Sequence, residues 1–211
     1  MATFPTKYDT PLSGLDWLEW YQGHKVYHPG IDFNKGKGND DCGQDVVAAK
    51  SGFVEFVHDS TWNSGGFGKQ VILIHKDGTF SRYAHLSEVL VQKSQEVKEG
   101  KKIGRVGNTG TTYCHLHFEV FGKEMARIQS RHWRRWRYYP SGKTKTWVMQ
   151  HYINPWEWLK DEDGIPQWAK ISTMWAKKEG LINNFEGNPM SDYEVSLVLH
   201  RFWKKYINKS R

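Results

Sequence analysis

Between residues 26 and 122, short hydrophobic runs alternate with glycine-containing turns. The runs are rich in β-branched and aromatic residues, which favour strands, and they occupy residues 45–49, 52–58, 69–75, 79–85, 102–106 and 115–121. The dipeptide Asp77-Gly78 separates two of these runs and is typical of a tight hairpin turn. This pattern predicts a mainly β domain of antiparallel strands, arranged as a sheet or a sandwich-like pair of sheets.

The pattern changes after residue 122. Residues 123–150 carry eight lysines and arginines against one glutamate, with tryptophans and tyrosines interleaved. A basic segment with aromatic side chains suits a polyanion, either a single-stranded nucleic acid or an anionic polymer of the cell wall, and it is equally compatible with a solvated loop that packs a few of its rings. We expect residues 123–150 to form an additional hairpin beside the β domain.

The end of the chain has the spacing of helices. After an acidic linker at residues 161–164, large apolar residues recur at helical intervals at Trp168, Ile171 and Trp175. We therefore expect a domain over residues 1–160, with its core at 20–122, followed by a small C-terminal α-helical hairpin over residues 165–211. This hairpin is a candidate wall-binding module, and a packing role is equally compatible with its sequence.

Charge and hydropathy limit the partners. The formal net charge of +7 favours anionic partners. No apolar run approaches the roughly 20 residues that a membrane-spanning helix needs, so we expect no membrane insertion. The first residues lack the basic and apolar regions of a secretory signal. Judged from the compartment that this implies, Cys42 and Cys114 are expected to be free thiols.

Two pairs of side chains have the spacing of metal ligands. His28 and Asp32 lie four residues apart, and His115 and His117 lie two apart in a predicted strand. Because alternate side chains of a strand share a face, His115, His117 and Glu119 point to one side. Three such ligands leave zinc a fourth position for water, whose pKa it lowers to about 7. Taken alone, either pair is more often a polar surface stripe or a structural pair.

Six blocks occur in an order that is more specific than either pair. They are HPGIDF (28–33), VVAAKSGFVEFV (46–57), GKQVILIHKDGTFSRYAHLS (68–87), VKEGKKIGRVGNTG (97–110), HLHFEV (115–120) and INPWEWL (153–159). Together they resemble the lysostaphin-type zinc metallopeptidases, which are peptidoglycan endopeptidases. The resemblance covers about residues 20–160 and implies a zinc peptidase domain there.

The resemblance also implies roles for single residues. One zinc ion is expected to be held by His28, Asp32 and His117, while His85 and His115 flank the water and the substrate carbonyl as catalytic groups. The sequence leaves open which of these two is the general base.

His75, within one of these blocks, and Cys114, just before HLHFEV, are not assigned to the metal site. His75 also falls in a family block, but a structural role is favoured for it. Cys114 stands where the family usually has a different residue before HLH, and we do not expect it to bind the metal.

The implied activity is zinc-dependent hydrolysis of peptide cross-links or stem peptides in bacterial peptidoglycan. Without a signal peptide, the chain would be a phage endolysin made in the cytoplasm and released through a holin pore, or a virion component. Anionic wall polymers are expected partners of residues 123–150 and the C-terminal helices, and nucleic acid is disfavoured. Which peptide bond is cut stays open.

Two other classes of protein share some of these sequence features. The first is a non-catalytic wall-binding activator of other hydrolases with the same fold, although all five expected side chains are present here. The second is a biotinyl- or lipoyl-carrier module. A carrier needs a modifiable lysine in a short hairpin motif, and Lys50 does not lie in one.

Overall fold

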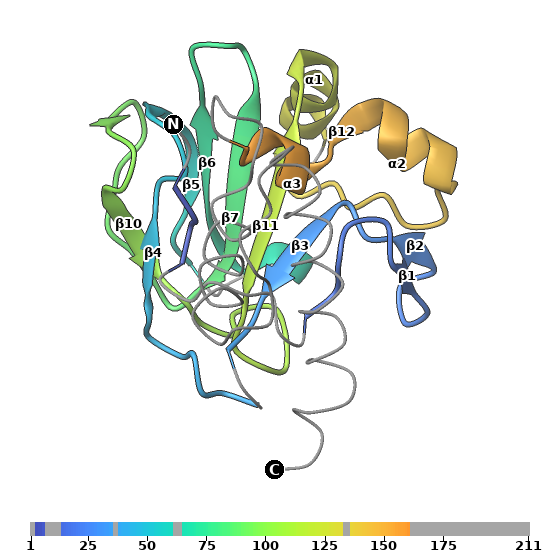
Figure 1. Cartoon of the computed structure of the whole chain (residues 1–211), viewed down its shortest axis with the longest axis horizontal. Helices are drawn as coiled ribbons and strands as arrows, with labels where there is room; N and C mark the ends of the chain where they lie inside the picture. The colour runs from blue at the N-terminus through green and yellow to red at the C-terminus, as the bar shows by residue number, and fades with distance from the viewer. Residues whose placement is uncertain (1–2, 7–13, 36–37, 61–64, 133–135, 161–211) are drawn as a thin grey trace, which may run out of the picture.

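A seven-stranded antiparallel sheet forms the centre of the protein (Figure 1). Its strands lie in the order β12-β11-β7-β6-β5-β9, and β3 also pairs with β11. Along one edge of β11, β3 pairs with the first four residues and β12 with the last two. The bounds are Gly30–Phe33 (β3), Gly52–His58 (β5), Lys69–Ile74 (β6), Phe80–Leu86 (β7), Glu96–Val97 (β9), Leu116–Phe121 (β11) and Tyr152–Ile153 (β12).

Two smaller sheets accompany this one. The first has the order β4-β10-β8, and the second is the hairpin β1-β2. Their strands are Trp20–Tyr21 (β1), Val26–Tyr27 (β2), Asp45–Val47 (β4), Glu88–Val89 (β8) and Lys102–Arg105 (β10). A single 3-10 turn, Gly65–Phe67 (η1), precedes β6. The structure is a computed structural model, and it describes residues 3–6, 14–35, 38–60, 65–132 and 136–160.

The predicted mainly β, antiparallel fold is confirmed, and the strands match the predicted runs closely. Gly78 adopts a positive φ of 80° in the turn between β6 and β7, as a glycine in such a hairpin can without strain. The predicted linker at 161–164 and helical hairpin at 165–211 lie outside the described residues. None of the described helices is both long and apolar enough to span a membrane.

The basic segment 123–150 does not form the predicted hairpin. It contains the helices α1 (Lys123–Arg131) and α2 (Lys145–His151), and a further short helix, α3 (Pro155–Trp158), follows β12. In α1, Met125, Ala126 and Gln129 are buried at helical spacing. This burial favours a helix over the predicted hairpin, because an amphipathic helix can cover the sheet while its basic side chains stay in water.

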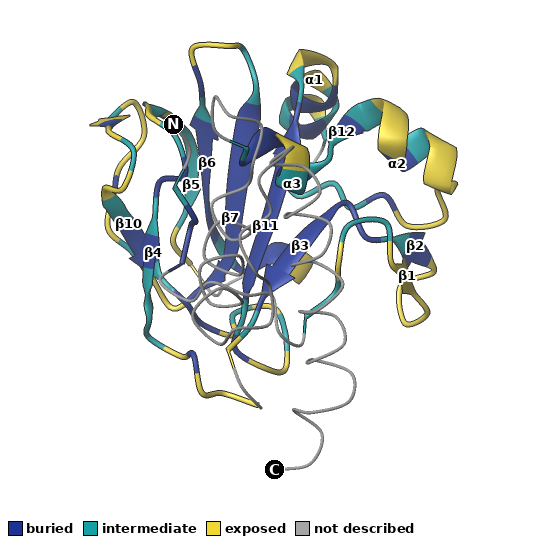
Figure 2. Ribbon diagram, in the orientation of Figure 1, coloured by how far each residue is buried: buried dark blue, intermediate teal, exposed yellow. Residues whose placement is uncertain are grey.

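The main sheet has a hydrophobic core on each face, and its central strands are buried along their length (Figure 2). Leu116, Phe118 and Val120 of β11 face the core that the three-stranded sheet covers. Phe121 packs into a second core beneath α1 and α2, together with Phe80, Trp136 and Val148 among others. His117 and Glu119 alternate with the first group, so they lie on the second face.

Candidate metal site and cleft

Three predicted ligands meet where β3 pairs with β11. In this pair Asp32 lies directly opposite His117, and His28 precedes β3 by two residues. Nδ1 of His117 lies 2.9 Å from Oδ1 of Asp32 and 3.0 Å from Nε2 of His28. Nε2 of His28 lies 3.2 Å from the same Asp32 oxygen. All three side chains are buried. In sequence, His117 lies 85 residues after Asp32 and 89 residues after His28.

The spacing of these atoms fits a divalent metal ion. One ligand atom from each residue lies within 4.8 Å of the other two. Two imidazole nitrogens and one carboxylate oxygen are ligands typical of catalytic zinc, which binds them at about 2.0–2.2 Å. At that distance tetrahedral ligands are about 3.3 Å apart, which is close to the separations found here. The residues present therefore fit zinc, and three protein ligands leave a tetrahedral zinc ion one further position.

The carboxylate of this group is in the form that binds metal. Burial alone would raise the pKa of Asp32, but the charge of His28 and the hydrogen bond with His117 outweigh burial and hold that pKa well below its usual value. Metal ligands must be deprotonated before they bind. Asp32 meets that requirement at neutral pH.

A buried chain of charged side chains supports His117 from behind. Nε2 of His117 lies 3.0 Å from Oε2 of Glu119, and the other oxygen of Glu119 forms a 2.8 Å ion pair with Arg82. The side chains of Arg82 and Glu119 are completely buried. When a carboxylate accepts a hydrogen bond from the second ring nitrogen of a metal-binding histidine, it fixes the tautomer of that histidine and raises the basicity of the nitrogen that binds the metal. The alternation along residues 115–119 predicts the correct face for Glu119 but no role for it, and no sequence motif indicates Arg82.

The two predicted catalytic histidines lie together on the other side of the metal ligands. The ring centroids of His85 and His115 are 4.5 Å apart, and that of His85 lies 5.9 Å from His117. Nε2 of His115 is 3.8 Å from Oδ2 of Asp32. Both rings therefore lie next to the predicted ligands. Their catalytic roles remain predictions.

Backbone carbonyls orient both rings. Nδ1 of His85 lies 2.9 Å from the carbonyl of Thr109, and Nδ1 of His115 lies 3.0 Å from that of Tyr113. A carbonyl can accept a hydrogen bond but not donate one, so Nδ1 carries the proton and Nε2 remains for the cleft. His85 also adopts a positive φ of 62°, a strained conformation that is common at functional sites. Burial, and then the neighbouring His115 and His117, lower the pKa of His85 to about 3, so this ring is neutral.

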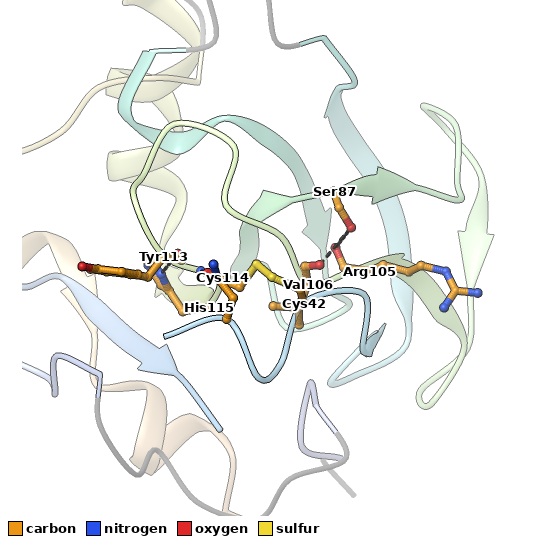
Figure 3. The surroundings of a disulfide bond; sticks show 8 residues. Cys42, Ser87, Arg105, Val106, Tyr113, Cys114 and His115 are labelled. Carbon is orange, nitrogen blue, oxygen red and sulfur yellow. Dashed lines mark hydrogen bonds between the residues drawn. A yellow bond between two sulfur atoms is a disulfide. The ribbon is translucent and has the colours of Figure 1, made fainter. Parts of the chain in front are cut away.

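A disulfide between Cys42 and Cys114 lies directly before His115 (Figure 3). The expectation of two free thiols is therefore wrong. The two Cα atoms are 5.3 Å apart although 72 residues separate the cysteines, so only the folded chain reveals the pair. The backbone N–H of Cys114 also donates to Oδ1 of Asn39 at 2.9 Å. Both bonds hold the loop before β11 against the segment that contains Cys42.

A cleft opens over the four histidines and Asp32. Its walls come from the β1-β2 hairpin, η1, the loop after β10 and the segment between α1 and α2. The lining residues are Leu15, Tyr21, His24, His28, Asp32, Gly66, Phe67, His85, Gly110, Thr111, His115, His117, Arg137, Tyr139 and Ser141. Sequence analysis did not single out Arg137 or Tyr139 as cleft residues. The basic aromatic composition of their segment was the available signal.

His75, the remaining histidine of the family blocks, has no contact with the cleft among the interactions described. Its Nδ1 lies 3.0 Å from the carbonyl of Ser51, its Nε2 lies 2.8 Å from Oγ of Ser81, and its ring packs on Trp158. These are the contacts of a histidine that stabilises the fold.

Comparison with known proteins identifies the family. The sequence model of peptidase family M23 matches residues 26–129, which include all five residues of the metal and histidine cluster. Lipoprotein NlpD of Yersinia enterocolitica is 38% identical over 78 residues, which cover 37% of this chain and 77% of that protein. The chain belongs to peptidase family M23.

Other similar proteins share a smaller part. Murein hydrolase activator NlpD of Escherichia coli (strain K12) is 34% identical over 117 residues, or 53% of this chain. This M23 chain spans only 29% of the length of that relative. The catalytic domain of lysostaphin from Staphylococcus simulans has 26% identity and a TM-score of 0.48, covering 70% of this chain and 91% of that structure. Arg137 and Tyr139 lie beyond the region that the M23 family model matches.

Proposed function

We propose that this M23 chain is a zinc-dependent endopeptidase that cuts peptide cross-links or stem peptides of bacterial peptidoglycan. One observation carries the proposal. His28, Asp32 and His117 present three ligand atoms to a single point, and two further imidazoles face the same cleft. A site that only stabilised the fold would not need His85 and His115 beside an open position.

The chain's own groups supply the remaining chemistry. When bound, zinc would lower the pKa of a water ligand to about 7 and polarise the scissile carbonyl. Because Nδ1 of each ring is bonded to a backbone carbonyl, Nε2 is the nitrogen that faces the cleft. In the neutral ring of the pair, Nε2 accepts the proton of the attacking water, and in the protonated ring it donates a hydrogen bond to the carbonyl oxygen as that oxygen becomes negative. Glu119 and Arg82 keep His117 in the tautomer that directs Nδ1 to the metal.

A non-catalytic activator of other wall hydrolases is the second candidate. It is supported by the printed name of the Escherichia coli relative, a murein hydrolase activator. The five complete side chains favour the hydrolase, because an activator needs neither a metal nor His85 and His115. Zinc content and hydrolysis of purified walls separate the two.

The test compares three kinds of variant on purified peptidoglycan, with released fragments identified by mass spectrometry. His28→Ala, Asp32→Ala and His117→Ala should lose both zinc and activity. His85→Ala and His115→Ala should keep zinc and lose activity by about 10²- to 10⁴-fold. The matched control is His151→Ala, since His151 stacks on Trp147 at the end of α2, away from the cleft.

Each outcome has a meaning. If the zinc-loaded protein leaves walls and stem peptides intact but stimulates a separate wall amidase, the activator is the correct function. Loss of zinc in His85→Ala or His115→Ala would show that the roles of ligand and catalytic group are assigned wrongly.

We further propose that the chain acts at the cell wall, outside the cytoplasm, as an endolysin or a virion-associated lysin. The disulfide supports this, because such bonds persist in oxidising compartments. Exposed cations on residues 123–150, among them Lys123, Arg127 and Lys145, suit anionic wall polymers. Wall binding by residues 165–211 is part of the same proposal, and a 1–160 truncation compared with the full chain in a wall-binding assay tests it.

A further inference from the structure

The loop between β10 and β11, residues 106–115, orients both predicted catalytic histidines. The carbonyl of Thr109 accepts from Nδ1 of His85 at 2.9 Å, and the carbonyl of Tyr113 accepts from Nδ1 of His115 at 3.0 Å. The middle of the loop is exposed or half-buried, so few core contacts restrain it. The positions of the two rings therefore depend on the points at which this loop is attached to the rest of the fold.

One attachment of the loop lies next to His85. The hydroxyl of Thr109 accepts from the backbone N–H of Lys69 at 2.9 Å and donates to the carbonyl of Leu86 at 2.7 Å. These bonds tie Thr109 directly to β6 and β7. The carbonyl that orients His85 is therefore held without help from the far end of the loop.

The other attachment is the disulfide, whose Cys114 directly precedes His115 (Figure 3). A single hydrogen bond, from the N–H of Cys114 to Oδ1 of Asn39, accompanies it. Cys114 is buried in the same core as Leu116, whereas Cys42 is exposed. A reductant would therefore reach the disulfide from the side of Cys42, and breaking the bond would release the part of the loop that orients His115.

The segment that contains Cys42 is a firm base for this attachment. The N–H of Gly43 donates to the carbonyl of Val106 at 2.8 Å, and the N–H of Val106 donates to the carbonyl of Gln44 at 2.8 Å. The segment is thus bonded in both directions to the residue that follows β10. The disulfide transmits this fixed position to Cys114.

The metal ligands do not share this dependence. Asp32 and His117 are held opposite each other by the pairing of β3 with β11, and neither strand contains a cysteine. Opening the disulfide would therefore displace His115 and leave the ligands in place.

We propose that the Cys42–Cys114 disulfide is a positioning link for His115, so that the reduced chain binds zinc but hydrolyses slowly, and oxidation completes the active site. This inference rests on the proposed hydrolase function and adds redox control to the same site. Reduction takes two electrons and two protons from a dithiol, which itself becomes a disulfide, and leaves two cysteine thiols. The chain would be nearly inactive in a reducing compartment and would gain activity in an oxidising one.

The experiment compares the oxidised and the reduced zinc-loaded full chain on a synthetic stem-peptide dimer. Reduced protein is prepared with a dithiol, freed of it and reloaded with zinc in the absence of air. Its kcat should be about 10- to 100-fold lower, because misplacing a catalytic group by about 1 Å has an effect of this size. KM and zinc affinity should stay within about twofold, and reoxidation should restore kcat.

A variant without the bond controls for the treatment. Cys42→Ser should have the low kcat from the start, and the same dithiol treatment should not lower it further. Leu73→Ala controls for a general loss of stability, because it removes buried packing from β6, so it should lower the urea midpoint and leave kcat of the folded, oxidised chain unchanged.

The variant His115→Ala tests whether the link acts through this ring. Reduction of this variant should change its residual kcat by less than about twofold, because the group that the link positions is absent. A decrease as large as in the wild type would overturn the proposal, and so would equal kcat values for the oxidised and reduced wild type. Loss of zinc on reduction would also overturn it, since the link would then support the fold as a whole.

Hydrogen exchange separates this inference from the function on which it rests. On reduction, the backbone N–H groups of Cys114 and His115 should exchange at least about tenfold faster, while that of Lys69, bonded to Thr109, should not change. If the oxidised chain cuts no peptide but reduction has this effect on exchange, the hydrolase proposal fails and the link to His115 holds. If hydrolysis occurs and reduction changes neither kcat nor exchange, the positioning link fails alone.

Discussion

The buried pair formed by Arg82 and Glu119 allows the stability of the fold to be separated from the affinity for metal. Arg82→Met leaves the Glu119 carboxylate buried without its cation, which should lower the free energy of unfolding by about 3–5 kcal/mol. We expect the upper half of this range, because Arg82 also donates to the carbonyl of Trp136 and lies 3.9 Å from the centroid of the Phe67 ring.

The double variant Arg82→Met/Glu119→Leu replaces both charges with apolar groups. Buried ion pairs replaced in this way are often neutral or more stable, so the double variant should recover at least about 2 kcal/mol relative to Arg82→Met. It should not recover zinc affinity. His117 then lacks the acceptor for its Nε2 proton, and loss of such a partner weakens metal binding about 10- to 100-fold.

Stability is measured by urea denaturation of the zinc-free protein, because bound zinc would itself add to the unfolding free energy. Zinc affinity is measured by competition with a chromophoric chelator. The control is Arg105→Met, which breaks surface ion pairs with Glu88 and Asp45 and should change stability by about 1 kcal/mol or less. Zinc affinity in the double variant within twofold of the wild type would refute the supporting role of Glu119, and a double variant as unstable as Arg82→Met would refute the energetic reasoning.

Three further predictions concern the metal, the disulfide and His85. Chelation should abolish hydrolysis, and added zinc at about 1,000 times its dissociation constant should restore it and raise the unfolding free energy by about 4 kcal/mol, measured by denaturation with and without metal. Replacing Cys42 and Cys114 by serine opens a loop of 72 residues and should cost about 4 kcal/mol on the chain-entropy account; an unchanged urea midpoint would argue against a formed bridge. Thr109→Val removes a hydroxyl that accepts from the N–H of Lys69 and donates to the carbonyl of Leu86, so it should loosen His85 and lower kcat about tenfold while zinc stays bound; equal loss of zinc would contradict this.

Local pattern was sufficient to predict β4, β5, β6, β7, β10 and β11, and the face of β11 on which the predicted ligand His117 lies, but not the shorter strands β1, β2, β3, β8, β9 and β12. Alternation along HLHFEV places Leu116 and Phe118 in the core and His117 on the opposite face, as the structure confirms. The Asp77-Gly78 turn was also predicted correctly, because its backbone conformation depends on the residues at that turn.

Features that depend on contacts between distant segments were not predictable in this way. Nothing near Cys42 or Cys114 in sequence indicates that the folded chain brings them together. The role of Arg82 depends on the register between β7 and β11, which places Arg82 opposite Glu119. For residues 123–150 an additional hairpin was predicted, whereas the structure has the helix α1, in which Met125 is buried against the second core.

The register of β3 on β11 decides whether Asp32 and His117 can meet at one metal site. A slip of one residue would bring Ile31 or Phe33 opposite His117 in place of Asp32, and these side chains point to the opposite face of the sheet. Such a misaligned molecule could not bind the ion. On the proposed function, zinc binding would therefore stabilise only molecules in which β3 has this register, and only those molecules would hydrolyse substrate.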